Sequence, residues 1–264
     1  MVSDWRLIEE KGDSASWNMA LDEALLRTYD DNDRPIFRLY EWEKALSFGR
    51  FSKPEALLHL DRMEQEGIAS VRRITGGGIL VHGGDISYAL FLPRRFVASR
   101  GVKESYRYLC SFLLRFYHKL GLDAAFAQEQ NISESHTPIC LAGREAYDII
   151  IEGCKIGGNA QHYTHQALLQ HGSIPMRLDT VGFKGCFSTE SGLEEAASLE
   201  KLGIKWEKEA IKALLKQSFE EAFGVTLRPD TLRDDEWSTA ERLHDEKYSR
   251  EAWNVHAQST SYQA

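Results

Sequence analysis

The most informative segment of the chain is residues 72–82, which read Arg72-Arg73-Ile74-Thr75-Gly76-Gly77-Gly78-Ile79-Leu80-Val81-His82. Three successive glycines let the backbone turn sharply and come close to a ligand, so that N–H groups can contact an anion or a carbonyl oxygen. A guanidinium matches carboxylate and phosphate geometry, but in an extended segment Arg72 and Arg73 point in opposite directions, so we expect only one to reach a site. The spacing fits neither a Walker loop nor a dinucleotide-binding turn, and a glycine-rich hairpin with two surface arginines is an equal alternative.

A second glycine-rich segment, residues 153–161, reads Gly153-Cys154-Lys155-Ile156-Gly157-Gly158-Asn159-Ala160-Gln161. Lys155 stands just before a Gly-Gly pair, where a thin backbone lets a bound group approach the ammonium. In that position Lys155 would stabilise negative charge that develops on a carbonyl or phosphate. For an isolated lysine, a surface position after a tight turn is the simpler alternative.

The pattern of apolar residues predicts a mixed fold, because some stretches show helical spacing and others alternate. We expect helices over residues 18–29, 53–66, 103–120, 206–223 and 233–246, the first capped by Ser16. We expect a two-stranded hairpin over residues 35–49, and further strands over 70–74, 79–82, 85–92, 148–152, 155–163 and 167–177, with a turn at Gly153-Cys154. Strands and helices do not alternate regularly, so the fold class is α+β. One domain is expected over residues 1–264, with 205–255 a helical C-terminal segment packed on a strand-rich body.

Composition limits the classes of function. The chain has 264 residues, of which 42% are hydrophobic and 27% charged, as in an ordinary globular domain. Its formal net charge of -8 disfavours nucleic-acid binding. There is no apolar window near ~18 residues and no secretory pattern at the start, so we expect no membrane partner and a cytoplasmic location. Cys110, Cys140, Cys154 and Cys186 form no Cys-x-x-Cys pair, and no metal site is expected.

Basic residues gather in one part of this acidic chain. Arg94, Arg95, Arg100 and Lys103 lie close together in the sequence. A local basic patch suits an acidic partner protein or a small anion. A solvated surface of mixed charge is the simpler explanation for any one of these residues.

Five segments together resemble one known family. Residues 72–78 with His82 resemble the Arg-Arg-x-x-Gly-Gly signature of the lipoate–protein ligases and octanoyltransferases, and residues 155–161 resemble their Lys-(Ile/Val)-x-Gly-(Ser)-Ala-Gln element. Residues 18–23 (Asn-Met-Ala-Leu-Asp-Glu), 170–174 (Gln-His-Gly-Ser-Ile) and 247–254 (Lys-Tyr…Trp-Asn) match three further elements. Each is weakly specific alone, but the five follow the family's order over nearly the whole chain. Asn159 departs from the usual serine.

The resemblance implies a fold and a site. The fold would be that of the biotin/lipoate ligase catalytic domain, related to class II tRNA synthetases, with a mixed sheet flanked by helices. The glycine strand and Lys155 would line a tunnel for an acyl chain, with Leu46, Ile74 and Val81 as candidate lining residues that core packing explains equally well. The residues implied to bind substrate are Arg72, Arg73, Gly76, Gly77, Gly78, His82, Gly158, Ala160 and His171.

Two chemistries occur in this family. A transferase branch uses a cysteine as acyl acceptor, and Cys140 lies in the corresponding stretch, although Leu141 departs from the phenylalanine that follows it there. Lys155 would lower the pKa of the Cys140 thiol and hold the oxyanion, while His82 and His171 are possible general bases or structural histidines. This route requires no cofactor. The alternative is a ligase that uses ATP and Mg to form a lipoyl-adenylate.

The leading hypothesis is therefore transfer of an octanoyl or lipoyl group through Cys140. Its partners would be an acyl-carrier donor and a lipoyl-domain or glycine-cleavage carrier acceptor, which the basic patch could receive. A non-catalytic acyl-binding protein on the same fold is a further alternative, and biotin ligation is a weaker one. The resemblance does not separate octanoyl from lipoyl.

Overall fold

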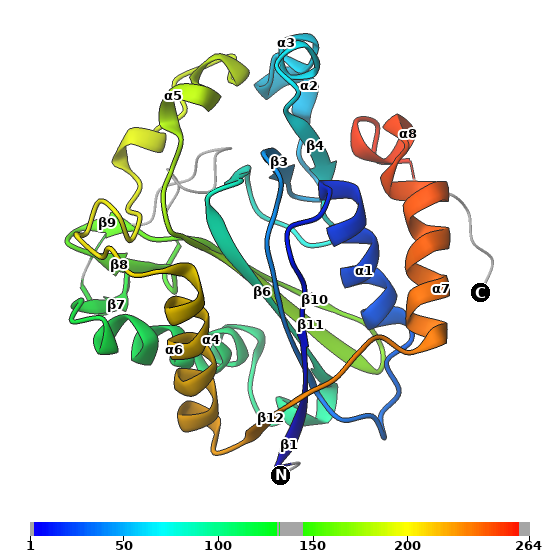
Figure 1. Ribbon diagram of the computed structural model, residues 1–264, viewed down its shortest axis with the longest axis vertical. Helices are drawn as coiled ribbons and strands as arrows, with labels where there is room; N and C mark the ends of the chain where they lie inside the picture. The colour runs from blue at the N-terminus through cyan, green and yellow to red at the C-terminus, as the bar shows by residue number, and fades with distance from the viewer. Residues whose placement is uncertain (1–2, 131, 133–144, 259–264) are drawn as a thin grey trace.

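A six-stranded mixed sheet forms the centre of the molecule in the computed structural model (Figure 1), which describes residues 3–130, 132 and 145–258. The strand order is β10-β11-β6-β2-β1-β12. β1 runs parallel to both β2 and β12, and the other neighbouring pairs are antiparallel. The bounds are β1 Asp4–Glu9, β2 Ile36–Tyr40, β6 Asp85–Pro93, β10 Gly158–Tyr163, β11 Ala167–Pro175 and β12 Thr226–Pro229. The predicted α+β class is confirmed.

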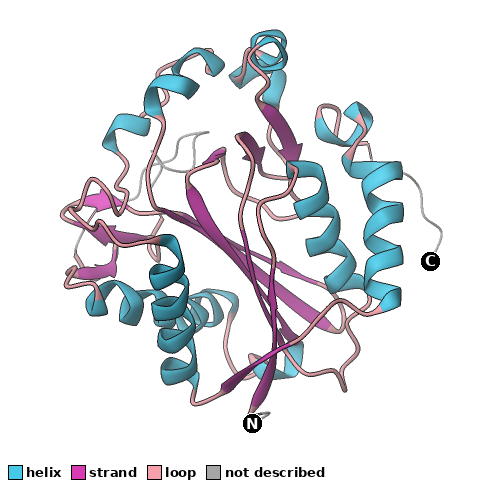
Figure 2. Ribbon diagram, viewed as in Figure 1, coloured by secondary structure: helices cyan, strands magenta, loops and turns pink. Residues whose placement is uncertain are grey.

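Helices cover both faces of this sheet (Figure 2), because side chains of successive strand residues point to opposite sides. Leu7 and Phe37 point toward α4 and α6, and Phe37 stacks on Phe219 of α6 at 4.4 Å between ring centroids. Ile8 and Ile36 point toward α1 and α7 on the other face. The bounds of these helices are α1 Ala15–Arg27, α4 Val102–Lys119, α6 Lys208–Phe223 and α7 Asp234–Leu243.

Two small three-stranded sheets flank the main one, in the orders β4-β3-β5 and β7-β8-β9. Their bounds are β3 Ala45–Phe48, β4 Ala69–Arg72, β5 Leu80–His82, β7 Ala124–Phe126, β8 Ile149–Ile151 and β9 Cys154–Lys155. The turn expected at Gly153-Cys154 lies one residue earlier, at Glu152 and Gly153, which both have positive φ, and Cys154 begins β9. The predicted hairpin over residues 35–49 is wrong. β2 joins the main sheet and β3 a small one, because both strands are buried throughout and each needs neighbours of its own.

The helical predictions hold with shifted bounds. Ser14 rather than Ser16 caps α1, where its hydroxyl accepts a hydrogen bond from the Trp17 amide. The helix expected over residues 53–66 divides into α2 and α3, because Leu58 adopts an extended conformation and pairs with Phe187. The short helices are α2 Pro54–Leu57, α3 Leu60–Gln65, α5 Thr180–Phe183 and α8 Glu251–Asn254.

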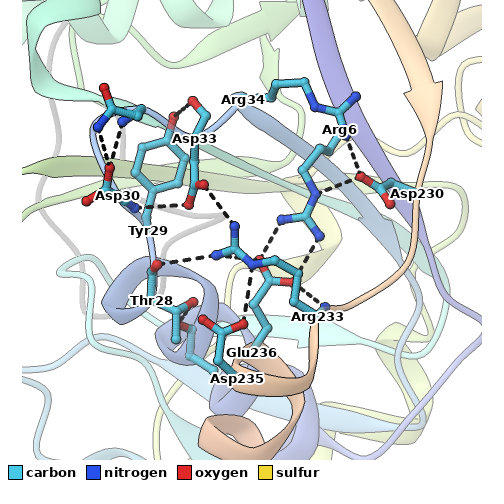
Figure 3. A network of polar contacts seen from close by, with 12 residues as sticks. Arg6, Thr28, Tyr29, Asp30, Asp33, Arg34, Asp230, Arg233, Asp235 and Glu236 are labelled. Atoms are coloured by element: carbon cyan, nitrogen blue, oxygen red, sulfur yellow. Dashed lines mark hydrogen bonds and ion pairs between the residues drawn. The ribbon is translucent and has the colours of Figure 1, made fainter.

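The C-terminal segment is not wholly helical, because its strand β12 extends the main sheet beside β1. A partly buried ion-pair network stabilises this edge of the sheet (Figure 3). Arg6 donates to Glu236 Oε1 at 2.5 Å and to Asp230 Oδ2 at 2.9 Å. Arg233 in turn reaches Asp33 Oδ1 at 2.9 Å, beyond the end of α1.

Within the described part of the chain, no helix is long and apolar enough to span a bilayer.

Candidate functional site

The two glycine-rich segments meet at one cavity of about 30 Å³. Gly76 and Gly77 form one side of it, and Gly158 and Ala160 at the start of β10 form another. Arg73, His82 and His171 also line it. Apolar surface comes from Met19, Tyr40, Trp42 and Leu80. Some of the sequence-predicted residues of each segment are therefore brought together, with side chains of α1 and β2 beside them. Among the described residues of the predicted site, those that do not line the cavity are Arg72, Gly78 and Lys155.

Backbone geometry explains Gly77 of the first segment and the neighbouring Gly49. A Cβ at Gly49 would lie 2.0 Å from the Gly77 carbonyl oxygen, so the end of β3 lies directly against the glycine turn. Gly77 itself has φ +98, a conformation that side chains disfavour. Arg73 Nη2 donates to the carbonyls of Gly76 and Gly78 at 3.3 and 2.9 Å. Arg73 thus holds the turn from within.

The second segment is also shaped by backbone contact. Gly157 has φ +68, and a Cβ there would lie 2.1 Å from the Ser173 carbonyl oxygen. The chain leaves β9 through this residue and enters β10 in a different sheet. Asn159 passes beneath Gly172, and its Oδ1 accepts a hydrogen bond from Tyr88 at 2.7 Å. Asparagine therefore replaces the family's serine with a side chain that is fixed in the cavity wall.

His82 belongs to a buried chain of polar contacts. Its Nδ1 lies 2.9 Å from Asp85 Oδ2 and its Nε2 lies 2.7 Å from Ser47 Oγ. The ring stacks on Trp42, with centroids 3.9 Å apart and planes 13° apart. Burial acts to raise the pKa of Asp85, but the adjacent His82 and the hydroxyl donors Ser173 and Ser87 hold that pKa below its usual value.

His171 belongs to a second, similar chain. Its Nδ1 lies 2.9 Å from Asp22 Oδ2 and its Nε2 lies 2.8 Å from Thr75 Oγ1. Burial lowers the pKa of His171 and outweighs the hydrogen bond to Asp22, which favours the imidazolium. Burial also acts to raise the pKa of Asp22, but Arg38, which donates to Asp22 at 2.6 Å, keeps that pKa below its usual value.

The side chains of Arg72 and Arg73 point in opposite directions, as expected for successive residues of an extended segment. Arg73 lines the cavity, whereas Arg72 is not one of its lining residues. Arg72 instead donates to carbonyls of the segment before α2 and of the C-terminal segment, at distances of 2.7 to 3.4 Å. These acceptors belong to Gly49, Arg50, Ser52, Trp253 and Val255. Arg72 therefore joins the glycine strand to the end of the chain.

Lys155 is buried and ion-paired. Its Nζ lies 2.7 Å from Asp148 Oδ2, and the Lys155 and Asp148 side chains are 5% and 7% exposed. Lys155 is not among the residues that line the cavity, although Gly158 follows three positions later. Its ammonium is therefore held at a fixed place behind the second glycine segment.

The candidate nucleophile Cys140 lies outside the described residues. Among the described cysteines, Cys110 packs fully buried in the core, and burial raises the pKa of its thiol. Cys186 is also buried, and burial raises its pKa. Cys154 is partly exposed beside Lys155.

Other candidates lie away from the cavity. Leu46, Ile74 and Val81 do not line it and pack in hydrophobic clusters, as their core-packing alternative predicts. The basic patch begins where β6 ends, whereas the cavity lies where β6 begins. A nine-residue strand separates these ends by roughly 25 Å. Arg95 is also paired with Asp31 at 2.9 Å.

Sequence reasoning missed several polar residues of the site. Ser47 lies on β3 and Trp42 lies before it, and neither residue belongs to a distinctive motif. Asp22 lies inside the matched helix segment, next to a second acid, Glu23, and no local pattern indicates that its carboxylate is part of a site. Asp85 follows His82 by three positions, and this spacing is the one signal that could have indicated a pair.

Comparison with known proteins agrees with this geometry. Residues 14–220 match the family described as the Lipoyl protein ligase A/B catalytic domain. Proteins named Octanoyltransferase LipM are similar over 96% of this chain and 99% of their own lengths, at 29% identity in Lysinibacillus sphaericus and 32% in Kyrpidia tusciae. A structure described as a bi-partite lipoate protein ligase and its E2 lipoyl domain, from Thermoplasma acidophilum, superimposes with a TM-score of 0.82 at 25% identity. That superposition covers all of both chains.

The mixed sheet with flanking helices is the fold of a lipoate protein ligase-like catalytic domain. This chain belongs to the Lipoyl protein ligase A/B catalytic domain family, with full-length octanoyltransferase relatives. The predicted family, fold and enzyme class are confirmed.

Proposed function

We propose that this chain moves an octanoyl or lipoyl group from a carrier thioester onto a lysine of a lipoyl-type carrier domain, through an acyl-enzyme on Cys140. The observation that carries the proposal is the cavity at which both glycine segments converge. Its apolar lining suits a fatty chain, because each buried methylene contributes about 0.8 kcal/mol. Ligand pockets usually enclose hundreds of Å³, so the walls must separate when a chain enters.

The proposed reaction has two balanced steps. The Cys140 thiolate attacks the thioester carbonyl, an acyl–sulfur bond forms on Cys140, and the donor leaves as its thiolate. The acceptor lysine amine then attacks this acyl-enzyme, an amide forms, Cys140 leaves as a thiolate, and the amine proton passes to solvent. In both steps negative charge develops on the carbonyl oxygen. Glycine-turn N–H groups and the ammonium of Lys155 would stabilise that charge.

The relatives support transfer over ligation, because the proteins named octanoyltransferase match this chain along nearly their full lengths. The alternative is an ATP-dependent lipoate–protein ligase, which the Thermoplasma structure favours. A ligase would release pyrophosphate from ATP and Mg with free lipoic acid, and a transferase would not. A non-catalytic acyl-binding protein would show neither reaction and would retain octanoate binding. The same Thermoplasma structure, with its E2 lipoyl domain, motivates a lipoyl domain as acceptor.

The decisive experiment is the intact mass of the protein after mixing with an octanoylated carrier domain. We expect one octanoyl adduct that is lost on adding an unmodified lipoyl domain, with the mass appearing on the acceptor. Cys140→Ser should abolish the thioester adduct. Cys154→Ser is the matched control, because Cys154 is the partly exposed cysteine among those the structure describes. Retention of the adduct in Cys140→Ser would refute the cysteine route.

A further inference from the structure

Polar side chains in the wall of the cavity are unfavourable neighbours for an apolar acyl chain. The inference drawn from them rests on the proposed function. The lining residues of the cavity include Ser47, Ser87, Ser173 and Tyr40, which carry hydroxyls, yet the proposed ligand is an apolar chain. Displacing water from such groups is unfavourable unless each polar hydrogen already has an acceptor in the protein. The direction of these hydrogens therefore decides whether the wall tolerates an acyl chain.

Three of the hydroxyls donate to carboxylates behind the wall. Ser87 and Ser173 donate to Asp85 Oδ2 at 3.0 and 2.8 Å, and Tyr40 donates to Asp22 Oδ2 at 3.1 Å. The indole N–H of the neighbouring Trp42 donates to Ser87 Oγ at 2.9 Å. Among the described residues, the buried side-chain polar atoms without a hydrogen bond are Trp5 Nε1 and Ser105 Oγ, and neither residue lines the cavity.

Arg73 sets the direction of the hydroxyl hydrogens of Ser47, which lines the cavity, and of Thr75, which contacts the lining residue His171. It donates to Ser47 Oγ through Nη1 at 2.7 Å and to Thr75 Oγ1 through Nε at 3.4 Å. A guanidinium carries donors and no acceptor, so both hydroxyl oxygens accept from Arg73. The contact left for each hydroxyl hydrogen is an imidazole Nε2, that of His82 for Ser47 and that of His171 for Thr75.

Hydroxyl donation fixes the proton on each ring. An Nε2 that accepts a hydrogen bond carries no proton, so the ring proton lies on Nδ1, which faces Asp85 in His82 and Asp22 in His171. We propose that Arg73 is a positioning residue that, through Ser47 and Thr75, holds His82 and His171 as neutral Nδ1–H tautomers and so directs the polar hydrogens of the wall away from an acyl chain. One guanidinium orders both chains and the glycine turn.

Nitrogen NMR of the full-length protein with labelled histidine tests this assignment directly and does not depend on activity. At pH 7.5, His82 and His171 should each show a protonated Nδ1 and an unprotonated Nε2. In Arg73→Lys, one ammonium cannot reach both hydroxyls, and at least one ring should become a tautomer mixture. A wild-type Nε2–H or imidazolium at either position, or unchanged tautomers in folded Arg73→Lys, would overturn the proposal.

A kinetic test uses a matched pair at Thr75, because valine has the shape of threonine without its hydroxyl. In Thr75→Val, the Nε2 atom of His171 loses its hydrogen-bond donor and must give up water when the acyl chain enters. The KM for an octanoylated carrier should therefore rise about tenfold, whereas kcat should change less than threefold. Thr75→Ser keeps the hydroxyl and should restore the wild-type KM. Equal KM values in the two variants would refute the role of the hydroxyl. A wild type without transfer activity would refute the proposed function alone, and the NMR result would still decide the tautomers.

Discussion

The Lys155 ammonium lies 2.7 Å from the Asp148 carboxylate, and both side chains are almost completely buried. This pair joins the start of β8 to β9 behind the second glycine segment. A second donor, the Glu145 amide, reaches the same Asp148 oxygen at 2.7 Å. Asp148 therefore fixes the place of the lysine that we propose as a stabiliser of the oxyanion.

Lys155→Met should destabilise the protein by about 3–5 kcal/mol, because it leaves Asp148 as a buried charge without its cation. Urea denaturation followed by circular dichroism measures this loss. Adding Asp148→Asn to Lys155→Met should recover most of the stability, since the remaining group is neutral and similar in shape, but it should not restore acyl transfer. If Lys155→Met is as stable as the wild type, the ion pair is not structural.

Arg72 should matter for the position of the C-terminal segment rather than for substrate affinity. Arg72→Met removes donors to the Trp253 and Val255 carbonyls, and we expect a loss of about 3 kcal/mol or more. Hydrogen exchange should accelerate selectively over residues 251–257. Trp253→Phe is a milder control, because it removes one indole N–H that donates to the Arg72 carbonyl at 3.0 Å. A normal exchange pattern in Arg72→Met, with a raised KM instead, would return Arg72 to the substrate site.

The prediction of family and fold from sequence succeeded where local pattern and motif agree. The glycine turn, the long helix α4 and the turn at Gly153 are each determined by residues near one another in the chain. The hairpin over residues 35–49 failed because strand pairing depends on distant partners, here β6 for β2 and β4 for β3. Strand β12 was missed for the same reason, since it pairs with β1 at the other end of the chain.

The site was predicted unevenly. The two glycine-rich segments were recognised because runs of glycine indicate unusual backbone geometry, and Gly77 and Gly157 within them do have positive φ. The partners of the histidines were not recognised, since Asp22 lies 149 positions from His171 and no spacing rule joins them. Arg72 was predicted to bind substrate. Its carbonyl partners Trp253 and Val255 lie about 180 positions away in the sequence, so no local pattern could have indicated them.

Gly49 should tolerate no side chain. Gly49→Ala places a Cβ within 2.0 Å of the Gly77 carbonyl, and since both groups are backbone the turn must shift, at a cost of about 1–3 kcal/mol. Gly76→Ala is the matched control for stability, because an added Cβ there meets no atom within 4 Å. Thermal unfolding compares the two. A similar melting temperature for both variants would show that the turn does not lie against β3.

Stability should fall as the pH decreases from about 7 to 5, because of His171. Burial lowers the pKa of this imidazole in the folded state, whereas the unfolded chain has a pKa of about 6.5. Below about pH 6.5 the unfolded state therefore binds more protons than the folded state, and the free energy of unfolding decreases with pH until the folded pKa is reached. The groups that face the ring are Asp22, Thr75, Arg73 and His82.

His171→Gln tests this linkage, because glutamine is polar and does not titrate. The variant should lose part of the difference between the free energies of unfolding measured in urea at pH 7.5 and pH 5.0. Part of the decline should persist, since burial also lowers the pKa of His162, so His162→Gln should remove a further share. Asp22 and Asp85 do not contribute to the difference between pH 7.5 and pH 5.0. Their pKa values are lowered in the folded state, so the stability that they add is lost only below about pH 4. If the wild type and His171→Gln show the same pH dependence, burial does not lower the pKa of His171 in the folded state.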